Sequence, residues 1–168
     1  MTFVHVGPTA LYELGQIGEL DLLEWFDGAL VIPEAVQAEI TTEPARTNLD
    51  RLLEDGSVIT SVRPEVRAAV ADALEIDPES YEAALLAGLF DDSVDDERTV
   101  LVVSDDRRVR ALAEGLGASV TGSFGVVVRA ATQDKYLSSA DAKRIVSRMD
   151  DNGVQLTGQL RARAIGDL

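Results

Sequence analysis

Short apolar runs recur along the chain, and segments with helical spacing separate them. The runs are rich in Val, Ile, Leu or Thr and end at turn-forming residues, which is typical of buried β-strands. The run Thr-Val-Leu-Val-Val at residues 99–103 is the clearest example. We predict strands at residues 3–6, 29–32, 58–62, 99–103 and 118–121.

Helices are predicted between the strands, because apolar residues there recur every three or four positions. Leu11 and Leu14 show this spacing, and Thr9 is the predicted cap of their helix. Pro33 suits the first position of a later helix, and Ser139 suits the cap of the last one. We expect helices at residues 9–20, 22–26, 33–40, 48–53, 64–74, 77–89, 108–116, 126–132 and 139–149, with a weakly helical tail from residue 156.

The alternation of strands and helices predicts an α/β fold with a central parallel sheet flanked by helices. The 168 residues fit one domain, 1–168, with a substantial core. In such sheets, ligand sites lie at the carboxyl ends of strands. Segment 7–9 follows the first strand and segment 104–106 follows the clearest strand. We therefore expect a functional site at this edge of the sheet.

Asp105 and Asp106 are the first candidates for chemistry, because both follow the strand at 99–103 directly. Adjacent carboxylates repel each other unless a cation lies between them, and their hard oxygen atoms suit Mg²⁺ or Mn²⁺. The structural alternative is that one aspartate caps the next helix while the other is solvated. The local sequence leaves both interpretations open.

Other polar side chains are weaker candidates when each is taken alone. Glu39 lies on a predicted helix between apolar neighbours, and Glu79 and Glu82 lie near the start of another. Each is equally typical of a solvated helix surface. His5 is the only histidine, and we expect it to be buried and hydrogen-bonded within the first strand. The three arginines of segment 107–110 either contact phosphate or neutralise nearby acids.

Composition and charge describe the setting in which the chain works. Thirty acidic residues face fifteen basic ones, which gives a net charge of −15. We interpret this charge as adaptation to a salt-rich cytoplasm, where repulsion is screened; the alternative is a basic partner. The lack of cysteine excludes disulfides and thiolate metal sites. No apolar run approaches the roughly 20 residues that cross a bilayer, and no secretion signal is present, so we expect a cytoplasmic protein without membrane contact.

Three stretches of the chain share their features and order with a known family. Residues 11–40 contain a Gly-x-Leu-Asp-Leu-Leu element, a strand ending in Pro and a helix bearing Glu39. Residues 100–117, VLVVSDDRRVRALAEGLG, combine a strand, paired acids and an Arg-containing helix. Residues 121–130 contain a Thr-Gly-x-x-Gly turn and a helix. In this order the stretches resemble the PIN-like superfamily, in particular its prokaryotic toxin-type ribonuclease branch.

The resemblance implies a three-layer PIN-like fold and metal-assisted cleavage of RNA with Mg²⁺ or Mn²⁺. By position, Asp105, Asp106 and Glu39 match the metal-binding acids, and Glu82 adds a further catalytic carboxylate. The hydroxyl groups of segment 121–123 are expected close to the site. The resemblance also implies two partners, a small antitoxin protein and a second copy of the chain in a homodimer.

Two departures from the family's pattern weaken the expected site. The family's first acid, which ends the first strand, falls on Gly7, so this acidic position is degenerate. The usual Gly-Glu pair of the mid-chain helix is replaced by Glu79 and Ser80, and either Glu79 or Glu82 supplies a neighbouring carboxylate. His5, on the same strand face as Gly7, is another candidate substitute. The hypothesis is a weakened metal-dependent endoribonuclease, and the alternative is a catalytically inactive PIN-like module that binds RNA or protein.

Overall fold

The computed structural model describes residues 1–93 and 97–153, which contain a four-stranded sheet. Its strands are β1 (Thr2–Val6), β2 (Ala29–Val31), β3 (Thr99–Val103) and β4 (Ser119–Thr121). They lie in the order β2-β1-β3-β4, and every neighbouring pair is parallel. The register pairs Val6 with Val103 and Val103 with Thr121, so β1, β3 and β4 end at the same edge. The predicted parallel α/β sheet is confirmed.

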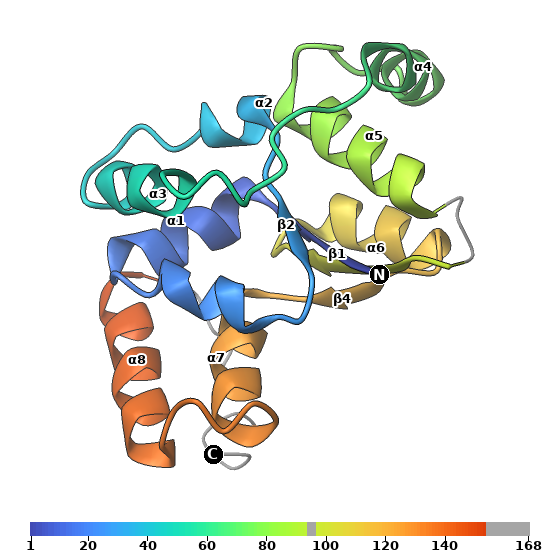
Figure 1. Cartoon of the computed structure of the whole chain (residues 1–168). Coiled ribbons are helices and arrows are strands. Elements are labelled where there is room, and N and C mark those ends of the chain that lie inside the picture. Colours follow the sequence, from blue (N-terminus) through green and yellow to red (C-terminus); the bar gives the residue numbers. More distant parts are fainter. Residues whose placement is uncertain (94–96, 154–168) are drawn as a thin grey trace.

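Helices flank this sheet on both sides (Figure 1). In one group, α5 (Tyr81–Ser93) contacts β1 and β3, and α4 (Pro64–Leu74) and α6 (Arg107–Gly115) pack against α5. The other group comprises α1 (Pro8–Gln16), the 3₁₀ helix η1 (Leu20–Trp25), α7 (Ser123–Thr132) and α8 (Ser139–Asp151). After β2 come α2 (Glu34–Gln37) and α3 (Ala45–Leu53). Within the described ranges, no helix has the length and hydropathy needed to span a bilayer.

The single histidine ties α5 to the sheet. His5 is fully buried in β1, and its Nε2 atom lies 2.8 Å from Asp92 Oδ2 near the end of α5. Arg98 Nη1 donates to the other Asp92 oxygen at 2.8 Å. Gly88 allows α5 to come this close, because an added Cβ atom there would lie 3.2 Å from His5 Cε1. The expected buried, hydrogen-bonded histidine is confirmed, and its ring is engaged with α5.

The predicted strand at residues 58–62 is wrong. Ile59 forms only an isolated parallel bridge to Val31, in which Ile59 N donates to Leu30 O at 2.8 Å. Pro33 has no N–H group with which to extend β2. Thr60 O then accepts from Glu34 N at 3.2 Å, at the start of α2. The backbone of this segment therefore turns to the helix instead of continuing a strand ladder.

Both predicted helix caps are displaced by one or two residues. The N-cap of α1 is Gly7, and Thr9 lies inside the helix because Pro8 already has the fixed φ of a first helical residue. The cap of α8 is Ser138, whose Oγ atom accepts from Asp141 N at 3.1 Å. The weakly helical tail predicted from residue 156 lies outside the described residues.

Candidate functional site

Three strands end side by side at the edge where a site was expected. Gly7, Ser104 and Gly122 follow β1, β3 and β4 at this edge. Gly7 N donates to Val103 O at 2.8 Å, and Ser104 N donates to Thr121 O at 2.9 Å, so the ladder continues one residue past the strands. The starts of α1, α6 and α7 are thereby brought together.

Asp105 lies across the start of α7. Its Oδ2 atom accepts from Ser123 N at 3.2 Å, which satisfies one backbone donor of that helix. Its Oδ1 atom lies over Gly122, where an added Cβ atom would come within 2.3 Å. Glycine at position 122 is therefore required for Asp105 to keep this position. The aspartate side chain remains exposed to solvent.

Glu13 is a site residue that the sequence analysis missed. Ser123 Oγ donates to Glu13 Oε2, which brings α1 against the start of α7. Burial raises the pKa of Glu13, the Ser123 hydrogen bond opposes this rise, and the nearby Asp105 charge adds to it. The Glu13 and Asp105 carboxylates therefore face each other across Ser123. The sequence did contain a clue to Glu13: it is the one acid of α1, and α1 follows the end of β1, where the expected acid is missing.

Asp106 has the structural role that the sequence left open. It is the N-cap of α6, and its Oδ1 atom accepts from Arg108 N at 2.8 Å and from Val109 N at 3.0 Å. Its Oδ2 atom accepts from the Tyr81 hydroxyl at 3.4 Å. The two neighbouring aspartates thus diverge: Asp105 turns to α7, and Asp106 turns to its own helix and α5.

Tyr81 is the centre of a second group of acids. Burial raises the pKa of Tyr81 first, and the charges of Asp106, Glu82 and Glu39 raise it further. Glu82 Oε1 lies 3.3 Å from Arg108 Nε. Glu39 is exposed in the turn after α2, because that helix ends at Gln37, so the prediction that Glu39 lies on a helix is wrong. All three predicted acids nevertheless raise the pKa of the same tyrosine.

Glu79 and Glu82, the two candidate substitutes for the acid of the usual Gly-Glu pair, contact different helices. Ser80 Oγ accepts from Ala83 N at 3.2 Å and so caps α5. Glu79 lies 3.5 Å from Arg67 on α4, with most of its side chain in solvent. Glu82 lies beside Arg108 at the start of α6. Of the two candidate glutamates, Glu82 is therefore the one near the strand-end edge.

The degenerate position at the end of β1 is filled by a neighbour. An added Cβ atom on Gly7 would lie 3.1 Å from Ser104 Oγ, and Ser104 is almost fully buried. That hydroxyl also accepts from Asp106 N at 3.2 Å. His5 pairs with Asp92 and offers no substitute for an acid at this edge. The acid that approaches from another element is Glu13.

The oxygen-rich edge has the chemistry to hold a hard cation. Mg²⁺ and Mn²⁺ prefer carboxylate oxygens, and Glu13 and Asp105 present two such groups to each other. Gly122 leaves room for Asp105 to do so. Within residues 1–93 and 97–153, no three His, Cys, Asp or Glu side chains lie close enough together to hold a metal ion. Glu13 and Asp105, which both contact Ser123, are therefore the only two carboxylates that we assign to the candidate cation site among the described residues.

The chain was compared with protein families, curated proteins and solved structures, and one family matches. A family model described as a PIN domain matches residues 6–168, nearly the whole chain. Comparison with curated proteins and with solved structures gives no match. The matched range includes every acidic residue of the strand-end edge.

Proposed function

Because the chain belongs to the PIN domain family, we propose that it is a toxin-type endoribonuclease dependent on Mg²⁺ or Mn²⁺, with an acidic site weakened at Gly7. The family supplies the nuclease ancestry. The finer activity, the RNA substrate and the metal are the proposal, together with the cytoplasmic location inferred from the sequence.

The observation that carries the proposal is the Glu13–Asp105 pair. Both carboxylates lie at the carboxyl edge of a parallel sheet, where α/β proteins bind ligands. Burial first, and then the Asp105 charge, raise the pKa of Glu13, and a shared cation would remove the repulsion between the two carboxylates. Glu13 thus supplies, from α1, a negative charge that Gly7 does not supply from β1.

The residues at the edge then have separate roles in the proposed reaction. A bound divalent ion supplies an activated water and charge stabilisation at the scissile phosphate. Glu13 and Asp105 would hold the ion, and the Ser123 hydroxyl orients Glu13 by donating a hydrogen bond to it. Asp106 and Glu39, which the family resemblance assigns to the metal, and the further catalytic carboxylate Glu82 all act on Tyr81 and would extend the acidic site. Asp106 also holds the start of α6 in place.

The test is cleavage of a single-stranded RNA by the full chain with Mn²⁺ in high salt. Asp105→Asn and Glu13→Gln should each slow cleavage at least about tenfold, because loss of a metal ligand or of its support typically costs 10–100-fold. Asp27→Asn and Glu114→Gln are matched controls, since both acids are exposed and lie outside the edge. Cleavage at the wild-type rate by both site variants would reject this site.

A gain-of-function variant tests the role of Gly7. Gly7→Asp alone crowds Ser104 Oγ, which lies 3.1 Å from the position of the new Cβ atom. Combining Gly7→Asp with Ser104→Ala removes that hydroxyl and restores the family's acid. We expect Mn²⁺ to bind this double variant about tenfold more tightly in calorimetric titration, since each added carboxylate strengthens a hard-cation site. Ser104→Ala alone is the control and should not gain affinity.

A catalytically inactive RNA- or protein-binding module is the second candidate. The observation that favours it is the buried Ser104 hydroxyl in the space where the family's first acid would lie. RNA binding without cleavage, and without heat on Mn²⁺ titration, would support this alternative. For an active enzyme, the proposal includes a small antitoxin protein whose addition stops cleavage, and a homodimer.

A further inference from the structure

Two of the three arginines at the start of α6 lie on opposite sides of that helix. Arg108 Nε lies 3.3 Å from Glu82 Oε1 on α5. Arg110 Nη1 donates instead to Ser104 O, just after β3, at 2.8 Å. With about 3.6 residues per turn, side chains two positions apart in a helix point in nearly opposite directions. Arg108 therefore neutralises a nearby acid, and Arg110 has a different role.

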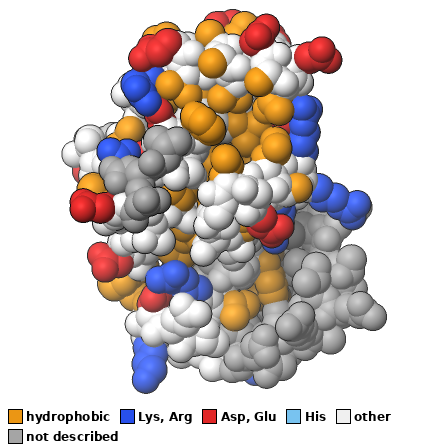
Figure 2. Space-filling view, turned by 90° about the vertical axis from the view of Figure 1, so that its right-hand side faces the viewer, with side chains coloured by type: hydrophobic (Ala, Val, Ile, Leu, Met, Phe, Trp, Pro, Cys, Tyr) orange, Lys and Arg blue, Asp and Glu red, His pale blue; other side chains and the backbone are white. Residues whose placement is uncertain are grey.

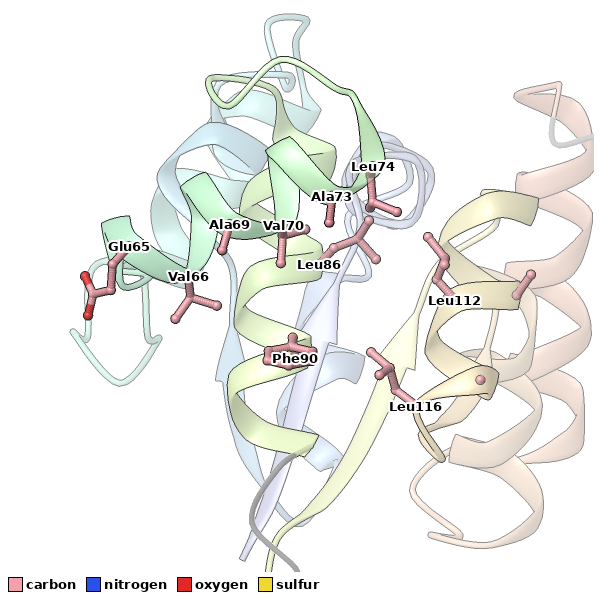
Figure 3. A pocket seen from close by; sticks show the side chains of 12 residues that line it. Glu65, Val66, Ala69, Val70, Ala73, Leu74, Leu86, Phe90, Leu112 and Leu116 are labelled. Atoms are coloured by element: carbon pink, nitrogen blue, oxygen red, sulfur yellow. The ribbon is translucent and has the colours of Figure 1, made fainter.

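Arg110 lies outside the apolar groove that α6 forms with α4 and α5. Figure 3 shows Leu112 and Leu116 of α6 directed toward α5, and both line this groove. Figure 2 shows hydrophobic side chains gathered over the upper part of the side of the molecule on which these helices lie. Leu112 follows Arg110 by two positions, so the guanidinium points away from the groove. Arg110 instead lies on the side of α6 that contacts β4 and the start of α7.

Arg110 reaches the candidate cation site at Gly122. A Cβ atom added to Gly122 would clash with Asp105 Oδ1 and would lie 3.7 Å from Arg110 Nη1. A carboxylate and a guanidinium therefore lie over the same glycine. Within the described residues, however, Arg110 forms no ion pair with a carboxylate, and its hydrogen bond goes to the Ser104 carbonyl. Its positive charge is thus held beside Asp105 without being paired to it.

The position of this guanidinium suits an anionic ligand. A guanidinium carries several N–H donors in a planar fork, and the bond to Ser104 O uses one of them. The side chain is partly buried and fixed by that carbonyl, so it loses little conformational freedom when a ligand binds. The remaining donors need an acceptor, and the fork matches the paired oxygens of a phosphate group.

We propose that Arg110 binds the RNA phosphate that the divalent ion also holds. Two cations near each other repel unless an anion lies between them, and a phosphate is attracted both to the ion at Glu13 and Asp105 and to the guanidinium. Arg110 would then stabilise the negative charge that develops on the phosphate during cleavage. The ion belongs to the proposed function on which this role rests, whereas the contact itself requires only that RNA binds at this edge.

Binding of a short fluorescent single-stranded RNA to the full chain tests the proposal. Anisotropy is measured over a range of KCl concentrations with Ca²⁺ in place of Mn²⁺, and gel electrophoresis verifies that the strand stays intact. At about 0.2 M KCl, Arg110→Gln should weaken binding about tenfold, the typical loss of a hydrogen bond to a charged group. The slope of log K against log salt should become shallower by about 0.7, the contribution of one phosphate contact on a single strand. Arg51→Gln is the matched control, because it removes the same charge from the exposed side of α3, outside the strand-end edge.

Two further measurements separate a phosphate contact from a structural role of Arg110. In calorimetric titration, Arg110→Gln should bind Mn²⁺ at least as tightly as wild type, because a positive charge is removed from beside the carboxylates. Arg110→Lys keeps the charge but not the planar fork, so it should keep the wild-type salt slope and bind RNA severalfold more weakly. Circular dichroism and melting verify that every variant is folded.

Anisotropy requires no cleavage, so the phosphate contact and the proposed nuclease activity can fail separately. A chain that binds RNA without cutting it would reject the activity, and the salt slope of Arg110→Gln would still decide the contact. Wild-type affinity and slope in Arg110→Gln, an equal loss in Arg51→Gln, or a wild-type chain that binds no RNA at any KCl concentration would overturn the proposal. Weaker Mn²⁺ binding by Arg110→Gln would overturn it as well, because Arg110 would then support Asp105 instead of the RNA.

Discussion

At the scale of single residues, Glu13 is held in a place that disfavours its charge. Burial and the neighbouring Asp105 carboxylate both raise the pKa of Glu13, and the Ser123 hydroxyl offsets only part of this. A side chain so placed is stabilised by either a proton or a cation. Without metal, the difference in stability between wild type and a Glu13 variant should therefore change with pH in a way that reports on this residue.

We predict that Glu13→Gln stabilises the chain at neutral pH in a buffer with a chelator. The pKa of Glu13 is higher in the folded chain than in the unfolded chain, where a glutamate has a pKa of about 4.3. Between the two pKa values the folded state binds more protons, so stability falls as pH rises and the loss is complete above the folded pKa. The melting temperature of Glu13→Gln should exceed that of wild type by about 1–3 °C at pH 7, a small effect because Glu13 is only half buried.

The gap between the two melting temperatures should narrow as the pH falls below the unfolded-state pKa of about 4.3, because wild-type Glu13 then becomes protonated in both states. Glu114→Gln, on the exposed part of α6, is the control and should follow wild type throughout. A gap that widens on acidification would contradict a raised pKa for Glu13.

The candidate site could be predicted in part from its residues. Asp105 and Asp106 lie at the expected strand end, because the apolar run before them marks β3 clearly. Which aspartate caps α6 depends on backbone angles that the sequence does not show. Glu13 could not be placed, because its role depends on how α1 packs against α7, and that contact joins positions 110 residues apart.

At the scale of elements, α5 is attached to the sheet by a buried polar link. His5 of β1 contacts Asp92 at 2.8 Å, and Arg98, just before β3, contacts the same carboxylate at 2.8 Å. One side chain thus joins a helix, a central strand and the chain entering the next strand. Removing one partner of such a buried hydrogen bond lowers the stability of the fold, because the other polar group stays buried without a partner.

We predict that Asp92→Ala destabilises the fold by about 2–4 kcal/mol, because it leaves the buried His5 ring without its partner. The melting temperature should fall by about 5–12 °C. Asp91→Ala is a matched control next in sequence, since Asp91 pairs with Arg63, whose side chain is 61% exposed. That surface pair should contribute at most about 1 kcal/mol. Equal losses in the two variants would show that the His5 link contributes nothing special.

Elements with strong local signals could be predicted closely. β3 and α4 have the predicted bounds, the first from its β-branched run and the second from Pro64 and its helical spacing. Residues 58–62 have strand-like composition as well, but a strand also needs a neighbouring strand whose backbone groups can pair with it. Pro33 ends β2 first, and Thr60 O bonds to the start of α2. The failure is therefore one of pairing and not of propensity.

At the scale of the whole molecule, the net charge is −15, and many arginines of the described residues form ion pairs. Arginine supplies the basic partner of ion pairs on many elements, including Arg46–Asp50, Arg108–Glu82, Arg129–Asp134 and Arg148–Glu19. Like charges also lie close to one another in the described part of the chain, as around Glu24. Although Glu24 is exposed, desolvation raises its pKa first, and the charges of Asp21 and Asp55 raise it further.

We predict that the melting temperature rises with KCl, steeply below about 1 M, because the Debye length falls from about 30 Å at 0.01 M to about 3 Å at 1 M. Glu24→Gln should flatten part of this rise, since it removes one member of an acidic group at η1. Glu114→Gln removes an acid from the arginine-rich α6 and should leave the slope unchanged or increase it. Using KCl instead of sulfate keeps preferential exclusion small, so that the slope reports screening. A melting temperature independent of KCl would mean that repulsion among these acids does not limit stability, and the interpretation of the charge as an adaptation to salt would fail.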